Sequence, residues 1–220
     1  MKKLALIGVG GHGDAICPYI DPQKYELVGY FDDKSIATHN DLPVLGKVAE
    51  VIQFLDNGTI DTVFIAIGDN KPRKLIFDML AENHYDKLIN VICPTATVLN
   101  PELLKGRGIF IGHEAFVGAL VEVADNVIIN TKSIVEHNSI IKSHCNVAPA
   151  SVILGSVTIN EGAYIGASTT IKQLLEIGSF ATVGAGAVVV KNITDDGTYV
   201  GVPARKMGES GNEWRNYEKC

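Results

Sequence analysis

The sequence predicts a two-domain protein in which an α/β domain with a parallel sheet precedes a parallel β-helix. Aliphatic residues recur every six positions over residues 97–192, and residues 3–92 alternate between strand-like and helix-like apolar segments. The first pattern replaces the second at Cys93-Pro94. Helical faces repeat about every 3.6 residues, so no helix keeps a six-residue period over this length. A parallel β-helix does, because three six-residue blocks close one coil.

The first domain is expected to contain four strands and three helices. The strands are predicted at Lys3–Val9, Tyr25–Phe31, Asp61–Ile67 and Leu88–Ile92. The helices are predicted from the end of a glycine-rich loop to Ile20, over Lys47–Leu55, and over Pro72–Asn83 with Asn70 as N-cap. Strands that alternate with helices indicate a parallel sheet with helices on its faces.

The β-helix is expected to bury the third residue of each block that starts at Thr97. These positions are Leu99, Lys105, Ile111, Val117, Val123, Ile129, Val135, Ile141, Val147, Ile153, Ile159, Ile165, Ile171, Ile177, Val183 and Val189. Small residues at other block positions are expected to face outward and let another chain approach, namely Ser151, Ala163, Ser168 and Ala187. We therefore predict domains at 1–93 and 94–192 and a tail at 193–220, whose last dozen residues are expected to be frayed or loosely docked.

Composition argues against several classes of function. The net charge of −6 disfavours nucleic acid and anionic membranes as partners. No apolar stretch approaches the length of about 18 residues that a membrane span needs. The short apolar run at the N-terminus ends in glycines, which favours a first β-strand over a signal peptide. Four cysteines, without metal-like spacing, indicate reduced thiols in a cytoplasmic protein: Cys17, Cys93, Cys145 and Cys220. Cys145 stands at a block position where Val, Ala and Ser also occur, so we expect it to pack.

A glycine-rich loop follows the first strand. Gly8–Gly13 reads G-x-G-x-x-G, which lets backbone N–H groups approach a phosphate at a helix N-terminus. Asp32, followed by Asp33, stands about 20 residues further on, where an acid can bind a ribose. About 93 residues are too few for both halves of an NAD site, so a mononucleotide or a nucleotide sugar fits better. The alternative is a tight turn with solvated aspartates.

His137 lies two residues past the inward Val135 and should leave the core at a corner. One coil of 18 residues later stands Gly155, and neighbouring coils lie about 4.8 Å apart. A base beside an unobstructed backbone N–H is a minimal acyl-transfer site. The alternative is a surface histidine without a role. The spacing of His113, His137 and His144 does not bring them together, so no metal site is expected.

Several motifs together resemble one family. The hexapeptide array with Val135-Glu136-His137, and the closing segment 200–205 (VGVPAR), resemble left-handed β-helix acyltransferases. The glycine loop, Phe31-Asp32-Asp33 and the segment 66–70 (AIGDN) narrow the resemblance to the sialic acid O-acetyltransferase and nucleotide-amino-sugar N-acetyltransferase family of bacterial surface-glycan pathways. The resemblance implies a Rossmann-like first domain, a left-handed coil and a homotrimer that binds acetyl-CoA between adjacent β-helices.

The resemblance also implies roles for individual residues. His137 is the expected general base, with Glu136 beside it, and the Gly155 N–H is expected to hold the thioester oxygen. Expected acetyl-CoA contacts are Asn146, Gly155, Ala167, Ala185 and Arg205. Expected nucleotide-sugar contacts are Gly10, Gly11, His12, Asp32, Asp33, Gly68 and Lys71. Asn138 stands where members often carry an acid and Asn146 where some carry a second histidine, so Glu136 is a possible substitute partner of His137.

We therefore expect N-acetylation of a nucleotide-linked amino sugar, a UDP-4-amino-4,6-dideoxyhexose, by direct transfer from acetyl-CoA without a metal. Two alternatives use the same fold and base: O-acetylation of sialic acid, and N-acetylation of GDP-perosamine. A non-catalytic scaffold that binds a nucleotide sugar is the alternative from another class. The acidic pair and the glycine loop favour a nucleotide-linked substrate, and the pairing of His137 with Gly155 favours an enzyme.

Overall fold

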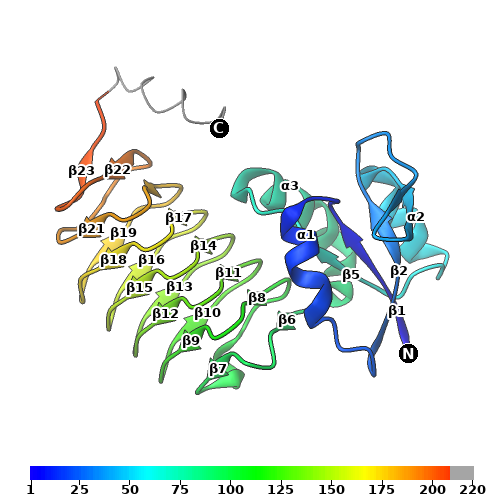
Figure 1. The fold of residues 1–220 in the computed structure, drawn as a ribbon, viewed down its shortest axis with the longest axis horizontal. Helices are drawn as coiled ribbons and strands as arrows, with labels where there is room; N and C mark the ends of the chain where they lie inside the picture. The colour runs from blue at the N-terminus through cyan, green and yellow to red at the C-terminus, as the bar shows by residue number, and fades with distance from the viewer. Residues whose placement is uncertain (209–220) are drawn as a thin grey trace.

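The computed structural model describes residues 1–208 as an α/β domain followed by a long parallel β-helix (Figure 1). The first domain has a five-stranded sheet in the order β3-β4-β2-β1-β5. Its strands are β1 (Lys2–Ile7), β2 (Tyr25–Phe31), β3 (Thr38–His39), β4 (Leu42–Gly46) and β5 (Thr62–Ile65). Its helices are α1 (Gly11–Ile16), α2 (Val51–Asp56) and α3 (Asn70–His84), with 3-10 turns η1 (Cys17–Tyr19), η2 (Val48–Glu50) and η3 (Tyr85–Lys87). β1 pairs in parallel with β2 and with β5, which confirms the predicted parallel sheet.

Three features of this domain differ from the sequence analysis. The β3–β4 hairpin was not foreseen, because its strands are short and partly polar. The N-cap of α3 is Asp69, whose side chain accepts a hydrogen bond from the Lys71 N–H at 3.0 Å, and Asn70 is already helical. The predicted fourth strand divides: Leu88 bridges Val63 of the first sheet, whereas β6 (Val91–Ile92) pairs with β8 of the β-helix. An apolar run does not reveal which of two sheets it joins.

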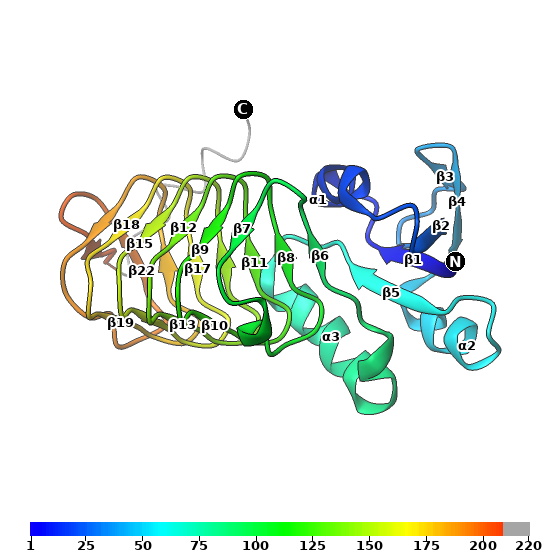
Figure 2. The ribbon, with the colours of Figure 1, turned by 90° about the horizontal axis from the view of Figure 1, so that it is seen from below.

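The β-helix consists of three parallel sheets that we call faces one, two and three (Figure 2). Face one holds β6, β8 (Phe110–Ile111), β11 (Ile128–Ile129), β14 (Asn146–Val147), β17 (Tyr164–Ile165), β20 (Thr182–Val183), β22 (Thr198–Val200) and the antiparallel β23 (Arg205–Lys206). Face two holds β7 (Thr97–Val98), β9 (Phe116–Val117), β12 (Ile134–Val135), β15 (Val152–Ile153), β18 (Thr170–Ile171) and β21 (Val188–Val189). Face three holds β10 (Glu122–Val123), β13 (Ile140–Ile141), β16 (Thr158–Ile159) and β19 (Glu176–Ile177), and the 3-10 turn η4 (Pro101–Leu103) precedes it in the first coil.

The aliphatic stripe forms the core, with a correction in the first coil. Every predicted inward residue from Ile111 to Val189 is at most 1% exposed. Leu99 is 51% exposed and Lys105 is also exposed, so those two predictions were wrong. The first coil is one residue longer than the regular coils that follow it: Val98 pairs with Val117, 19 positions on, whereas Val135 pairs with Ile153, 18 positions on. A slip of one residue turns the opposite set of side chains inward.

A second inward position in each block corrects another prediction. Ser151, Ala163 and Ala187 are fully buried, and only Ser168 is exposed as expected. The chain turns back toward the axis after each corner, so the residue two places before the aliphatic one also enters the core. Cys145 occupies this position and is fully buried, which confirms that it packs. Burial raises the pKa of its thiol to about 12.

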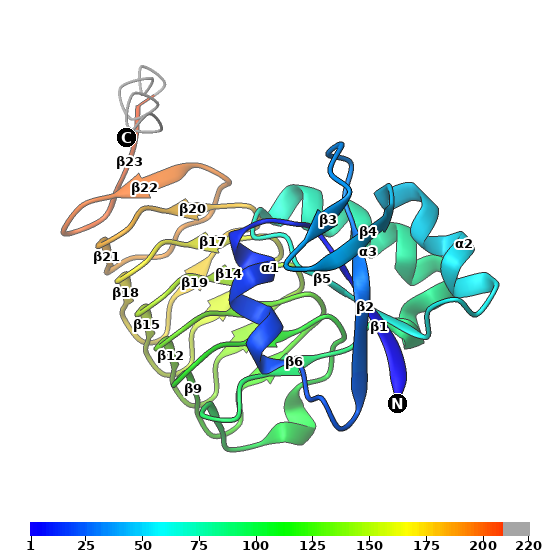
Figure 3. The same ribbon diagram turned by 45° about the vertical axis from the view of Figure 1, so that its right-hand side comes forward.

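The two domains pack through the loop after β5 and through α3, which lie against face one (Figure 3). Arg73 of α3 is 1% exposed and donates to carbonyl oxygens on both sides: Ile67 and Gly68 in the first domain, Asn126 and His144 in the β-helix. Desolvation lowers the pKa of its guanidinium to about 10. The junction therefore fixes the α/β domain on the β-helix.

Only the first part of the predicted tail, residues 193–208, belongs to the residues that the structure describes. Residues 193–208 include β22 and β23, while the frayed or loosely docked dozen lies outside the described residues. None of the helices formed by residues 1–208 is long and apolar enough to cross a membrane.

Candidate active site

His137 and Gly155 meet at the corner that follows face two, which we call the His137 corner. A Cβ atom added to Gly155 would lie 2.6 Å from Cε1 and 2.7 Å from Nε2 of His137. The imidazole therefore rests against the α-carbon of residue 155, one coil further along. His137 is exposed, and its predicted position past the buried Val135 is confirmed.

The backbone N–H of Gly155 donates no hydrogen bond to any described residue. The neighbouring Leu154 and Ser156 N–H groups bond to Ile171 O and His137 O. The equivalent N–H groups of His137 and Gln173 also lack a backbone partner within residues 1–208, so the free N–H is a regular feature of these corners, and at Gly155 no side chain covers it. A free donor beside an imidazole has the geometry of a general base next to an oxyanion site. The cleft here is lined by Glu136, His137, Leu154, Gly155, Ser156, Gln173 and Leu174.

Asn138 is the hydrogen-bond partner of His137. Its Oδ1 lies 2.9 Å from Nδ1 of the imidazole. The backbone of Asn138 adopts a left-handed conformation with φ of 59°, which asparagine tolerates better than most residues. With Oδ1 as acceptor, the ring carries its proton on Nδ1 and presents the Nε2 lone pair to the cleft. Glu136 lines the same cleft, but no hydrogen bond joins its carboxylate to His137.

The predicted acetyl-CoA contacts lie at different places on the β-helix. Ala167 and Ala185 follow β17 and β20 at the corner between faces one and two, which we call the Ala167 corner. Face two thus separates them from His137 and Gly155 within one chain. Arg205 is exposed on β23 beyond the last coils. Asn146 is 6% exposed on face one and donates from Nδ2 to Gly68 O at 3.1 Å, so it faces the first domain.

The glycine loop and the acidic pair meet at the carboxyl edge of the first sheet. Asp32 accepts hydrogen bonds from Val9 N–H (2.9 Å) and Lys34 N–H (2.8 Å), and Asp33 accepts from Val48 N–H (3.1 Å). The carboxylates therefore shape the loops around them, as the tight-turn alternative expects, and each oxygen keeps a further lone pair for a ligand. Gly10 and Gly11 have open space at the Cβ position, so a ligand can approach their backbone closely.

His12 turns from this loop toward the β-helix. Its ring packs edge-on against Phe110 of β8, with centroids 5.5 Å apart. Nε2 is buried and has no partner among the described residues. Burial and the nearby Arg73 lower the pKa of His12 to about 4, so the ring is neutral at physiological pH.

A cleft of about 830 Å³ lies where α3 meets face one, and we call it the junction cleft. One wall carries the first turn of α3, and the other carries outward residues of β14, β17 and β20 with the corner before β20. The lining comprises Gly68, Asp69, Asn70, Lys71, Asn146, Gly162, Tyr164, Phe180 and Thr182. The cleft thus brings the predicted sugar contacts Gly68 and Lys71 beside the β-helix. Sequence reasoning missed Arg73, Tyr164 and Phe180, because an arginine on a helix and aromatic residues on the surface of a β-helix have many ordinary uses.

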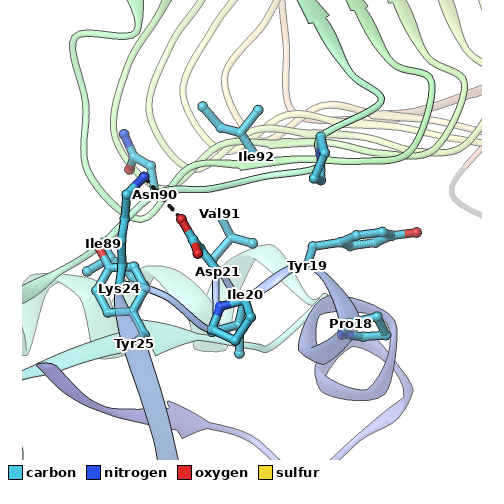
Figure 4. A pocket seen from close by; sticks show the side chains of 12 residues that line it. Pro18, Tyr19, Ile20, Asp21, Lys24, Tyr25, Ile89, Asn90, Val91 and Ile92 are labelled. Carbon is cyan, nitrogen blue, oxygen red and sulfur yellow. Dashed lines mark ion pairs between the residues drawn. The ribbon is translucent and has the colours of Figure 1, made fainter. Parts of the chain in front are cut away.

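A second hollow, of about 400 Å³, lies between the end of α1 and β6 (Figure 4). Tyr19, Tyr25 and Ile92 contribute apolar surface, and Lys24 pairs with Asp21 at 3.2 Å. None of the predicted site residues lines it, and its charges neutralise each other. We therefore place the chemistry elsewhere.

Comparisons with known proteins bear on the family and the fold. Residues 3–80 match the family model described as the PglD N-terminal domain. The acetyltransferase domain of PglB from Neisseria gonorrhoeae is 30% identical, with a TM-score of 0.81 over 94% of this chain and 100% of that chain. PerB from Caulobacter crescentus, solved with CoA and GDP-perosamine, is 28% identical, with a TM-score of 0.83 over 94% of this chain and 98% of that chain. These matches confirm the predicted fold class, an α/β domain followed by a left-handed β-helix.

The curated relatives match only part of this chain. A serine acetyltransferase from Buchnera aphidicola is 46% identical over 52 residues, which are 24% of this chain and 19% of that protein. The chain spans about a fifth to a half of the length of the first curated relatives it matches. They therefore say little about the substrate of the whole chain.

Proposed function

Because the chain belongs to the PglD-like N-acetyltransferase family, we propose that it transfers the acetyl group of acetyl-CoA to the amine of a nucleotide-linked amino sugar. The observation that carries the proposal is the contact between His137 and Gly155, with a free N–H at residue 155. A relative solved with acetyl coenzyme A and another solved with CoA and GDP-perosamine support the two substrate classes. The finer substrate that we propose is a UDP-4-amino-4,6-dideoxyhexose.

The reaction follows from the groups at the His137 corner. The sugar amine attacks the thioester carbonyl carbon, and Nε2 of His137 takes the amine proton as the C–N bond forms. The N–H of Gly155 donates to the carbonyl oxygen, which carries the developing negative charge. The C–S bond then breaks, and the proton on His137 neutralises the departing thiolate. Asn138 holds the imidazole through Nδ1, so that Nε2 stays unprotonated before the attack.

The position of each predicted binding residue in the fold indicates whether it would contact the nucleotide sugar or acetyl-CoA. We propose that Gly10, Gly11, Asp32 and Asp33 hold the nucleotide at the carboxyl edge of the first sheet, where ligands of open α/β sheets bind. His12, Gly68 and Lys71 would border the path from there to the junction cleft. Ala167, Ala185 and Arg205 are proposed to contact acetyl-CoA along the Ala167 corner. We leave Asn146 on the sugar side, because it bonds to Gly68.

We further propose a homotrimer in which each site is shared by two chains. His137 lies at one edge of face two and Ala167 at the other, so one chain cannot place both against one acetyl-CoA. The outward residues of face two form a mainly apolar row in register: Phe116, Ile134, Val152, Thr170 and Val188. Their burial against neighbouring copies would bring the His137 corner of one chain to the Ala167 corner of the next.

We also propose that the reaction takes place in the cytoplasm. Cys17, Cys93 and Cys145 are free thiols, which suits a reducing compartment. Acetyl-CoA and nucleotide sugars are also cytoplasmic metabolites.

The test is release of CoA thiol from acetyl-CoA against UDP- and GDP-linked 4-amino sugars and free sialic acid. We expect turnover with UDP-4-amino-4,6-dideoxyhexoses, and a loss of about 10²- to 10⁴-fold in His137→Ala. The matched control is His84→Ala, because His84 lies at the end of α3 and outside the cleft. Preference for GDP-perosamine or sialic acid would select one of the alternative substrates. Binding of nucleotide sugars without any thiol release would favour the non-catalytic scaffold.

A further inference from the structure

Two aromatic rings form an exposed wall of the junction cleft. Tyr164, outward on β17, is 39% exposed, and Phe180, at the corner before β20, is 36% exposed. The opposite wall is polar and carries Asp69 and Lys71 from the first turn of α3. The cleft thus has one apolar side and one charged side.

The fold does not require aromatic residues at these positions. Phe180 has φ of 57°; most other left-handed corners of the β-helix hold small or polar residues such as Asn126 and Ser156, two hold leucine, and Phe180 is the one phenylalanine, tyrosine or tryptophan among those described. The outward positions next to Tyr164 in the same sheet are Asn146 and Thr182. A bulky side chain in a left-handed conformation with an exposed ring lowers stability relative to asparagine. Because both rings line the junction cleft, they point to a ligand there.

The aromatic wall is held rigidly against the first domain. The ring of Phe180 covers Gly162, where an added Cβ atom would clash with it. The carbonyl oxygens of Gly162 and Ala163, which precede Tyr164, accept hydrogen bonds from Nδ2 of Asn70 at 3.0 and 3.1 Å. Asn70 is in the first turn of α3 beside Lys71. A sugar held by the loops of the first domain would therefore meet the rings in a fixed geometry.

We propose that Tyr164 and Phe180 determine specificity by reading the C6 substituent of the hexose. This inference rests on the proposed function and deepens it. The rings contact the apolar C–H face of the sugar and its C6 methyl group, while Lys71 on the other wall faces the diphosphate. A methyl group gains from contact with an aromatic face, whereas a C6 hydroxyl would be desolvated there without a partner.

The experiment compares two substrates that differ only at C6: UDP-4-amino-4,6-dideoxyglucose and UDP-4-amino-4-deoxyglucose. We expect the intact protein to favour the methyl sugar by about 10- to 100-fold in kcat/KM, the range of one group in an apolar pocket. The double variant Tyr164→Thr, Phe180→Asn should reduce this ratio to within about threefold of unity. Both substitutions suit the backbone, because Thr182 and Asn126 occupy equivalent conformations. The KM for acetyl-CoA should stay unchanged.

The control variant is Ile140→Thr, which removes a comparably exposed outward side chain from face three. It should keep the full preference. The inference is overturned if the double variant keeps the preference, if it dissociates the assembly in light scattering, or if it weakens UDP as much as the UDP sugars in calorimetry. Dissociation constants for the two UDP sugars are measured without acetyl-CoA. These constants test whether the aromatic wall recognises the C6 methyl group even if no acetyl transfer occurs. Failure of this inference is therefore distinguished from failure of the proposed function.

Discussion

The imidazole of His137 occupies the space that a side chain on Gly155 would need, with Cε1 only 2.6 Å from an added Cβ. Gly155→Ala should therefore push the ring away from the free N–H while the coil itself stays intact. We expect kcat to fall by about 10²-fold, since a small misplacement of a reacting group has effects of this size. Steady-state kinetics with both substrates measure it. Ser179→Ala, at an exposed corner residue, is the control, and wild-type kcat in Gly155→Ala would contradict the proposed site.

Asn138 should act on the reaction through His137. Asn138→Ala removes the 2.9 Å contact at Nδ1, so the ring can rotate and exchange tautomers. We expect kcat to fall by about tenfold, and Asn138→Asp to restore it, because a carboxylate accepts the same hydrogen bond. Imidazole ¹⁵N spectra of the free protein should lose the signature of the Nδ1-protonated tautomer only in the alanine variant. An unchanged spectrum would show that Asn138 does not orient the ring.

Removal of the acidic pair Asp32 and Asp33 should raise the KM for the sugar substrate more than the KM for acetyl-CoA. Asp32→Ala with Asp33→Ala removes carboxylates that face the nucleotide edge and also cap Val9 and Val48 N–H groups. A hydrogen bond to a charged group contributes about 1.5–3 kcal/mol, which corresponds to at least a tenfold rise in KM for the sugar. Asp61→Ala, an acid at the other end of the sheet, is the control. Equal rises in both KM values would place the nucleotide elsewhere.

Mixed assemblies test whether sites are shared. His137→Ala damages one edge of face two, and Ala185→Trp blocks the other edge. Homotrimers of either variant should be nearly inactive. Mixing the two should restore part of the activity, because some interfaces then pair two intact halves. A fully active monomer in light scattering would refute the trimer and the shared site together.

Stability should fall on acidification through His12. The folded protein lowers the pKa of His12 from 6.5 to about 4, so the unfolded chain binds the proton more tightly between these values. The contribution of neutral His12 is fully present above pH 6.5 and is lost as the pH falls toward 4, up to roughly 3 kcal/mol. His12→Leu should flatten this part of the pH dependence in urea unfolding at fixed protein concentration. An unchanged difference between pH 7 and pH 4.5 in the variant would contradict the assignment.

The sequence predicted the structural features that repeat from coil to coil and the contacts between residues one coil apart. The inward stripe from Ile111 onward and the meeting of His137 with Gly155 follow from a period of 18 residues, because stacking turns spacing into proximity. The extra residue of the first coil escaped prediction, because Leu99 continues the aliphatic period although it is exposed. Lys105 was the one interruption of the period, and a single interruption does not show that the coil has one residue more.

Features that depend on the docking of two domains were not predictable. The junction cleft joins Lys71 to Tyr164, which are far apart in the chain and share no periodic relation. Arg73 resembles any helical arginine in sequence, yet it is buried at the junction without a carboxylate. Glu136 was the possible substitute partner of His137 in the sequence, whereas in the structure the amide of Asn138 bonds to His137.

Arg73 also limits how this architecture can be recombined. Its guanidinium bonds to carbonyl oxygens of the loop after β5 and to those of two successive β-helix coils, so both partners must present these oxygens at matching heights. An α/β domain transplanted from another protein would bury a cation without acceptors, or leave those oxygens unpaired, at a cost of several kcal/mol. The two domains therefore fit together as a matched pair, and we expect a new sugar specificity to be reached by substitution within the junction and not by exchange of the first domain.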